Sequence, residues 1–195
     1  MKEAADGLPV MTFASAAAWR AWLSEHHEAA AGVWVAIAKA GTGIESVRYP
    51  EVLEHAICFG WIDGRRGRLD EQRFLQRFTP RRPRSPWSRI NREKAERLAE
   101  EGLMAPAGLD QVRRAKEDGR WDRAYAPQST AAVPDDLRRE LDASPAAAAM
   151  FAALSSQNRY AILYRLDQAR RPETRARRLA EYVRMLEAGE TLHPQ

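Results

Sequence analysis

Hydrophobic and polar positions repeat with two different periods along the N-terminal half of the chain. Two short apolar runs, residues 10–13 and 33–38, are typical of strands. Between them, a segment that follows the capping residue Ser15 shows the i, i+3, i+4 spacing of a core-facing helix. The residues of that stripe are Ala18, Trp19, Trp22 and Leu23.

The same reading predicts further elements up to residue 119. Residues 50–60 form a helix that begins at a proline and ends at a glycine. Residues 61–63 and 73–78 are strands, joined by a basic turn around Gly64 and Gly67. Two helices follow, one from Ser85-Pro86 to Gly102 and one from Pro106 to Gly119. Their expected inner faces are Trp87, Ile90, Asn91, Lys94, Ala95 and Leu98, and then Leu109, Val112 and Ala115.

The pattern becomes purely helical beyond a linker rich in Pro, Ser, Thr and Ala at residues 126–133. Each later segment has its own start signal, and these are Pro134, Ser144-Pro145, Ser155 or Ser156, and Pro172. The sequence therefore predicts an α+β protein. A mixed domain with a short antiparallel sheet covers residues 1–127, and an all-helical subdomain covers residues 128–195.

Composition limits the class of protein. The chain has 195 residues, 45% of them hydrophobic and 30% charged, with a net charge of +4, as in ordinary globular domains. One cysteine, Cys58, excludes an internal disulfide framework and fits a reducing compartment. No run reaches the roughly 18 apolar residues of a membrane span, and the short apolar stretch at residues 8–18 lacks a basic leader. We expect a cytoplasmic protein.

Arginine is concentrated in one block. Ten of the chain's 27 arginines lie between residues 65 and 92, against only two acidic residues, Asp70 and Glu71. Arginine binds phosphate and carboxylate with two parallel hydrogen bonds and stacks on flat rings. The prolines at 80, 83 and 86 stiffen the second half of the block, which reduces the entropy cost of holding donors in place. The block therefore predicts an anion-binding cleft.

The predicted cleft takes guanidinium groups from Arg77, Arg81, Arg82 and Arg84 and hydroxyl groups from the same loop. The residues expected to bind the ligand are Trp61, Arg77, Thr79, Arg81, Arg82, Ser85, Trp87, Ser88 and Asn91. Asn91 either lines this cleft or caps a neighbouring loop. Asp63 has three interpretations, as a general base, as a group that positions an arginine, or as a turn residue before Gly64.

Other kinds of chemistry have no support in the sequence. Cys58 and His55 share a helical face, but the apolar neighbours of Cys58 favour a buried core residue over a nucleophile. The remaining histidines have no metal-ligand spacing, and no dinucleotide, P-loop or serine-hydrolase motif is present. We expect no metal and no cofactor.

Several motifs together carry a resemblance that spans nearly the whole chain. They are Gly32-Val-Trp34, Phe59-Gly-Trp-Ile-Asp-Gly64, Arg77-Phe-Thr-Pro-Arg-Arg82 with Ser85, Trp87, Ser88 and Asn91, Ala107-Gly108, Asp118-Gly-Arg-Trp-Asp122 with Ala124-Tyr125, and Glu173-Thr-Arg175 with Arg178. The chain resembles the bacterial YdeI/OmpD-associated family, whose members are labelled bacteriocin-protection proteins. The resemblance implies a role in resistance to bacteriocins or cationic antimicrobials and implies no reaction. At Arg170-Arg171-Pro172 the chain departs from the family, which more often has Ala-Lys and no proline there.

Two functional hypotheses follow. The first is a stress-resistance protein that binds an anionic, phosphate-bearing ligand in the Arg/Trp/Asn cleft, with nucleic acid as one candidate. The alternative is an enzyme for a small anionic substrate, with Asp63 as general base and Arg77 and Arg81 as an electrostatic clamp. The sequence favours binding over catalysis. A third hypothesis is that the chain only mediates an interaction and binds a protein partner through its C-terminal helices.

Two structural expectations accompany these hypotheses. Arg81 is expected to be held for the ligand, so that its removal leaves stability unchanged, whereas Trp87 is expected to be core. Thr174, Arg175 and Arg178, in the first turns of the last helix, are expected to face an acidic group and to dock on the N-terminal domain.

Overall fold

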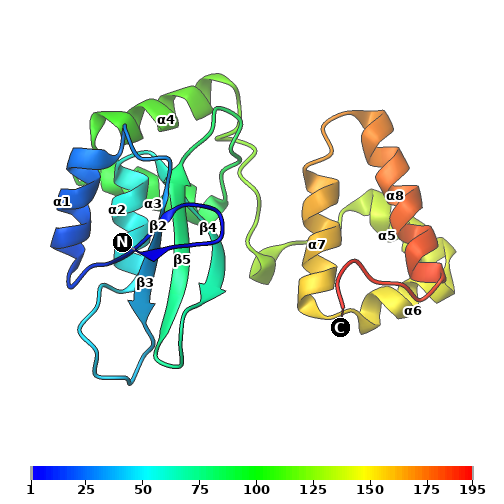
Figure 1. The fold of residues 1–195 in the computed structure, drawn as a ribbon. Coiled ribbons are helices and arrows are strands. Elements are labelled where there is room, and N and C mark those ends of the chain that lie inside the picture. Colours follow the sequence, from blue (N-terminus) through cyan, green and yellow to red (C-terminus); the bar gives the residue numbers. More distant parts are fainter. Residues whose placement is uncertain (1, 195) are drawn as a thin grey trace. The chain divides into compact units, whose positions relative to one another are not determined.

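A computed structural model describes residues 2–194, and the chain divides into two compact units (Figure 1). They comprise Met1–Ala124 and Tyr125–Gln195, whereas the sequence placed the boundary after residue 127. The first unit contains helices and a sheet, and the second contains helices. The predicted α+β class with a helical C-terminal part is confirmed.

The described residues of the first unit form a five-stranded sheet in the order β1-β2-β3-β5-β4. Its strands are β1 (Lys2–Glu3), β2 (Pro9–Thr12), β3 (Val33–Ala38), β4 (Trp61–Arg68) and β5 (Arg73–Pro80). Strands β2 and β3 are parallel, and the other neighbours are antiparallel. The sheet is thus larger than the short antiparallel sheet expected, because α1 forms a crossover between β2 and β3.

Four helices complete the first unit, namely α1 (Ala16–His26), α2 (Tyr49–Cys58), α3 (Arg89–Glu100) and α4 (Pro106–Glu117). Ser15 caps α1 as predicted, because its side chain accepts a hydrogen bond from the Ala18 amide. The buried side chains of α1, α2 and α3 pack with those of β3 and β5 in one core. Cys58 lies in that core, fully buried as predicted, and burial raises the pKa of its thiol.

The hairpin of β4 and β5 differs from the sequence prediction. Gly64 and Gly67 lie within β4, and the turn falls at residues 69–72. The side chain of Asp70 closes this turn by accepting hydrogen bonds from the amides of Gln72 and Arg73, at 2.9 and 2.7 Å. The Trp34 ring packs over Gly67, 3.4 Å from where a Cβ would stand.

The start of α3 was predicted three residues too early. Ser85 is used in a tight turn, in which its amide donates to the Arg82 carbonyl and its hydroxyl accepts from the Arg82 amide. Ser88 caps the helix instead, accepting from the Asn91 amide at 3.1 Å. The inner faces were also partly wrong, since Ala18, Ile90 and Leu109 are exposed.

Helix α4 approaches the end of α2 very closely. A Cβ at Gly108 would overlap the Cys58 carbonyl oxygen and stand 2.9 Å from that of Ile57. Gly60, with φ of +74°, ends α2 in the left-handed conformation, and a Cβ there would stand 2.9 Å from the Ala107 carbonyl oxygen. Both glycines are therefore required by this crossing.

The second unit contains η1 (Gln128–Thr130), α5 (Asp135–Ala143), α6 (Pro145–Ala153), α7 (Ser156–Asp167) and α8 (Pro172–Glu187). All four predicted helix starts are confirmed, with Ser144 and Ser155 as side-chain caps. The core is built from Leu137, Leu141, Phe151, Ile162, Leu166, Tyr182 and Leu186.

The arginines at the start of α8 bind inside this unit. Arg175 donates to the Asp136 carboxylate at 2.6 and 2.8 Å and to the Leu166 carbonyl at 2.7 Å. Arg178 donates to the Arg165 carbonyl at 2.6 Å. The expectation of an acidic partner is met by Asp136, which belongs to α5 of the same unit. The acceptors that the structure gives these arginines thus come from α5 and α7.

Candidate functional site on the open face of the sheet

The two faces of the sheet carry different side chains. Neighbouring positions along a strand alternate between faces, and directly paired residues share one. Val33 pairs with Phe78, and both belong to the core beneath the helices. Trp34 pairs with Arg77, so these two lie on the opposite face, which we call the open face.

On the open face, one carboxylate accepts hydrogen bonds from side chains of three strands. Asp6 accepts a hydrogen bond from the Trp34 indole at 2.9 Å, from Arg77 Nε at 3.1 Å and from Arg65 Nη2 at 3.5 Å. The Arg65 guanidinium also lies over the Trp34 ring, 5.3 Å from its centroid. We call these four residues the Asp6 cluster.

Asp6 reaches the cluster from the far edge of the sheet. It lies in the turn between β1 and β2, whereas its partners belong to β3, β5 and β4. Figure 1 shows this N-terminal segment, in dark blue, passing in front of β5 towards β4. The hydrogen bond from Trp34, followed by those from the Leu8 amide and Arg77, holds the pKa of Asp6 below its usual value. The carboxylate is ionised at neutral pH and faces two guanidinium groups.

The second half of the arginine-rich block is arranged differently. Arg81 is only 4% exposed, and its guanidinium carbon lies 3.5 Å from the centroid of the Trp87 ring. Its Nη1 donates to the Pro86 carbonyl at 3.1 Å. The expectation that Arg81 is held open for a ligand is therefore wrong, because the stacked ring and the loop backbone occupy it.

Other arginines of this region fasten the segment at residues 118–124. Arg89 and Arg92 of α3 donate to the carbonyls of Ala124 and Trp121, both at 3.4 Å. Arg120 donates to the Ser85 carbonyl at 2.9 Å. These contacts hold together two segments that are distant in sequence.

The other predicted ligand residues do not surround one opening. Trp61 and Trp87 are each 1% exposed, and Asn91 is 8% exposed beside Ala95 and Leu98. The remaining members have backbone or surface roles. Thr79 packs at Gly32, Ser85 forms the 82–85 turn, Ser88 caps α3, and Arg82 and Arg84 are exposed.

Asp63 is held by a tyrosine. The Tyr49 hydroxyl donates to its carboxylate at 2.8 Å. Asp63 pairs with Phe78, so it shares the helix-covered face, whereas Arg77 lies on the open face. Arg81 in turn stacks on Trp87. The three residues of the enzymatic hypothesis therefore do not converge.

Sequence reasoning missed three members of the Asp6 cluster. Arg65 was counted in the arginine-rich block but was not among the residues expected to bind the ligand. Trp34 had a usable signal, because it alternates with Val33 and Val35 and so lies opposite the core face. Asp6 had none, since only the folded sheet brings its turn to β4 and β5. Within the described residues, no group of three or more His, Cys, Asp and Glu could hold a metal ion. None of the helices between residues 2 and 194 is long and apolar enough to cross a membrane.

The fold and the Asp6 cluster define a two-unit α+β protein with an arginine-lined open sheet face. Residues 11–111, more than half of the chain, match the family described as "Domain of unknown function (DUF8412)". Residues 130–189 match the family described as "Bacteriocin-protection, YdeI or OmpD-Associated". The chain thus belongs to the DUF8412 family. The resemblance to the YdeI/OmpD-associated family is confirmed for residues 130–189, whereas most of the motifs that carried it lie in the part that matches DUF8412. No curated protein and no solved structure matches the chain.

Proposed function

We propose that this bacteriocin-protection-associated protein binds a phosphate-bearing anion on the open face of its sheet, at Arg65 and Arg77. The observation that carries the proposal is the Asp6 cluster itself. Two guanidiniums from different strands converge on one carboxylate, and this convergence supports the proposal. A phosphate offers the same kind of acceptor with more charge.

The charge balance of the cluster favours an additional anion. One carboxylate neutralises only one of the two guanidinium groups. The Arg65 side chain is 67% exposed and the Arg77 side chain 30%, so solvent and ligands reach both. Arg66 and Arg68 are also exposed on the same hairpin, but they pair with Gln76 and Phe74 and so lie on the other face of the sheet. Phosphates of one strand can therefore contact Arg65 and Arg77 together on the open face.

The buried indole changes the expected mode of binding. Trp34 is only 4% exposed and Arg65 lies over its ring. The ring supports the arginine and leaves little surface on which a base could stack. We expect affinity to come from phosphate contacts and to depend strongly on salt, with little preference for base sequence.

The test uses the full chain and a fluorescein-labelled single-stranded oligonucleotide, followed by fluorescence anisotropy at several salt concentrations. Each phosphate contact contributes about 0.7 to the slope of log affinity against log salt. The double variant Arg65→Gln/Arg77→Gln should bind more weakly, with a slope smaller by about 1.4.

The matched control removes two charges elsewhere. Arg139 and Arg177 are exposed on α5 and α8, so Arg139→Gln/Arg177→Gln has the same net charge as the test variant. If both double variants weaken binding equally, net charge alone explains the affinity and the open-face site is refuted. Absence of binding by the wild-type protein at micromolar concentration would exclude nucleic acid as the ligand, and the same variants would then be tested with polyphosphate.

A further inference from the structure

A cavity of about 380 Å³ lies on the helix-covered side of the sheet, between the loop at residues 39–48, the start of α2 and β5. Its apolar wall contains Ile37, Ile44, Val47 and Phe74. Ile37 pairs with Phe74 on the core face of the sheet, so the cavity is separate from the Asp6 cluster. Its volume falls in the usual range for small-molecule sites, about 300–1,000 Å³.

The hydroxyl groups around the cavity already have partners within the protein. The Thr42 hydroxyl donates to the Lys39 carbonyl at 2.9 Å, and the Ser46 hydroxyl accepts from the Ala38 amide at 3.1 Å. The Tyr49 hydroxyl donates to Asp63. These groups do not require a polar ligand to satisfy them, so the body of the cavity suits an apolar one.

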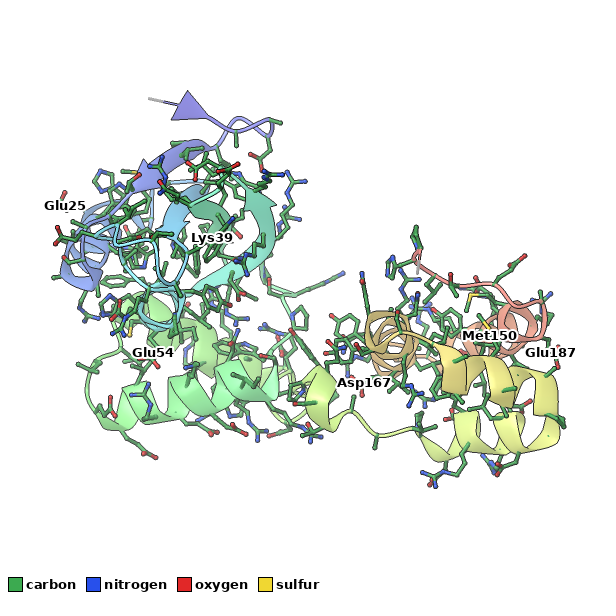
Figure 2. The ribbon with its side chains drawn as sticks, turned by 90° about the horizontal axis from the view of Figure 1, so that it is seen from below. Glu25, Lys39, Glu54, Met150, Asp167 and Glu187 are labelled. Atoms are coloured by element: carbon green, nitrogen blue, oxygen red, sulfur yellow. The ribbon has the colours of Figure 1, made fainter. Side chains whose placement is uncertain are left out.

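One end of the cavity differs, because it offers donors. Lys39, labelled in Figure 2, begins the loop, and its ammonium donates to the carbonyls of Asp70 and Glu71 at 3.4 and 2.8 Å. An ammonium has three donors, so one stays available. Gly41 and Gly43 have φ of +81° and +70°, with nothing within 4 Å of an added Cβ. A ligand can therefore approach the loop backbone closely.

The backbone amides of this loop point to an anion at that end. Among the hydrogen bonds of the described residues, none uses the amides of Ala40, Gly41 or Gly43 as donor. Successive amides in a turn that contains left-handed residues form a concave site for anions. Lys39, which begins the same loop, adds a positive charge to this region.

We propose that this cavity binds a small hydrophobic acid. Its hydrocarbon part packs against Ile44 and Phe74, above the buried Ile37 and Val47, and its carboxylate lies at the loop of residues 39–43, on the side of Lys39. The ligand class thus combines an apolar body with a single anionic head.

The first experiment is isothermal titration calorimetry of the full-length wild-type protein with straight-chain carboxylates from butanoate to octanoate. Each additional buried methylene should lower Kd about three- to fourfold, since burial of one methylene contributes about 0.8 kcal/mol. Octan-1-ol, which has the same chain without the charge, should bind about tenfold more weakly than octanoate or worse. Affinity that does not change along the series, or equal binding of the alcohol, would overturn the proposal.

Two variants test where the charged head and the hydrocarbon part of the ligand bind. Lys39→Gln should weaken octanoate about tenfold and leave octan-1-ol unchanged, because only the acid has a charge to lose. Thr42→Trp, which places a large ring at the cavity, should weaken both ligands, whereas Thr130→Trp, on the exposed surface of η1, should weaken neither. Equal loss of acid and alcohol in Lys39→Gln would show that Lys39 only supports the hairpin and would refute the assigned head group. None of these variants alters Arg65 or Arg77, so oligonucleotide binding should be unchanged in all of them, and the two proposals fail independently.

Discussion

Replacing Arg81 by alanine should destabilise the first unit substantially, in contrast to the neutral effect expected from the sequence. The guanidinium is desolvated against the Trp87 ring, at 3.5 Å from Cζ to the ring centroid. A desolvated cation–π contact contributes about 2 kcal/mol. The hydrogen bond from Nη1 to the Pro86 carbonyl involves a charged donor, and such bonds contribute about 1.5–3 kcal/mol. The two contributions overlap, and we expect a loss of about 3–4 kcal/mol in the free energy of unfolding.

Arg82 provides a control that differs by one position. Its side chain is exposed, so Arg82→Ala removes the same charge from the same loop and should cost no more than about 0.5 kcal/mol. Urea unfolding followed by tryptophan fluorescence measures the effect in the relevant unit, because all six tryptophans of the chain precede residue 125.

A double-mutant cycle tests the cause of the loss. Trp87→Ala should cost about 3–5 kcal/mol, since the ring is 1% exposed and packs edge-on against Trp121, 4.9 Å between centroids. If the stack is the reason for the Arg81 effect, Arg81→Ala should cost about 2 kcal/mol less when Trp87 is already absent. An Arg81→Ala protein as stable as Arg82→Ala, or strict additivity in the cycle, would refute this reasoning.

Three further predictions follow from individual contacts. Gly108→Ala should lower the free energy of unfolding by about 3 kcal/mol, because the new methyl group overlaps the backbone of α2. This value lies in the upper part of the range for overpacking. In the same urea assay, Leu109→Ala at the exposed neighbouring position should change the free energy of unfolding by no more than about 0.5 kcal/mol. Asp6→Asn should tighten oligonucleotide binding in anisotropy titrations, because it removes the carboxylate that competes for the two guanidiniums of the cluster, and weaker binding would contradict this role. The hydrogen bonds from Arg175 hold the pKa of Asp136 below its usual value, so this pair stabilises the second unit above the unfolded pKa of about 4 and the contribution disappears as pH falls through the folded value. Circular dichroism at 222 nm should therefore show that Asp136→Asn is destabilising at pH 7 and that the difference narrows below about pH 4, and a pH-independent difference would argue against the ion pair.

Local signals predicted the elements of this chain well. The four C-terminal helices begin at the prolines and serines that the sequence singled out, because a cap or a proline at the first turn acts on its own neighbours and needs no tertiary information. Val33–Ala38 was predicted with correct bounds, since a continuous apolar run between turn residues leaves little choice. The start of α3 was missed because Ser85 and Ser88 are both followed by good helical positions, and only the 82–85 turn decides between them.

The candidate site was predicted less well, because the fate of an arginine depends on what the fold places beside it. Only Phe78, Thr79 and Pro80 separate Arg77 from Arg81, and both arginines belong to the same basic block. The strand register places Arg77 on the open face, where it donates a hydrogen bond to Asp6. The Arg81 guanidinium instead stacks on the Trp87 ring. No composition or spacing distinguishes these two outcomes.

The ten arginines between residues 65 and 92 thus serve at least two physical purposes. Those after β5 donate to backbone carbonyls outside regular elements, Arg81 to that of Pro86 and Arg89 and Arg92 to those of the segment at residues 118–124. A guanidinium suits this task, because several donors on one planar group can satisfy carbonyls that no strand or helix pairs. The arginines on β4 and β5 lie on strands whose backbone is paired, apart from a bulge at residues 64–65, where the Gln76 side chain donates to both carbonyls, so their donors remain for side chains and ligands. This difference is the physical reason for placing the anion site on the hairpin and not in the loop that follows it.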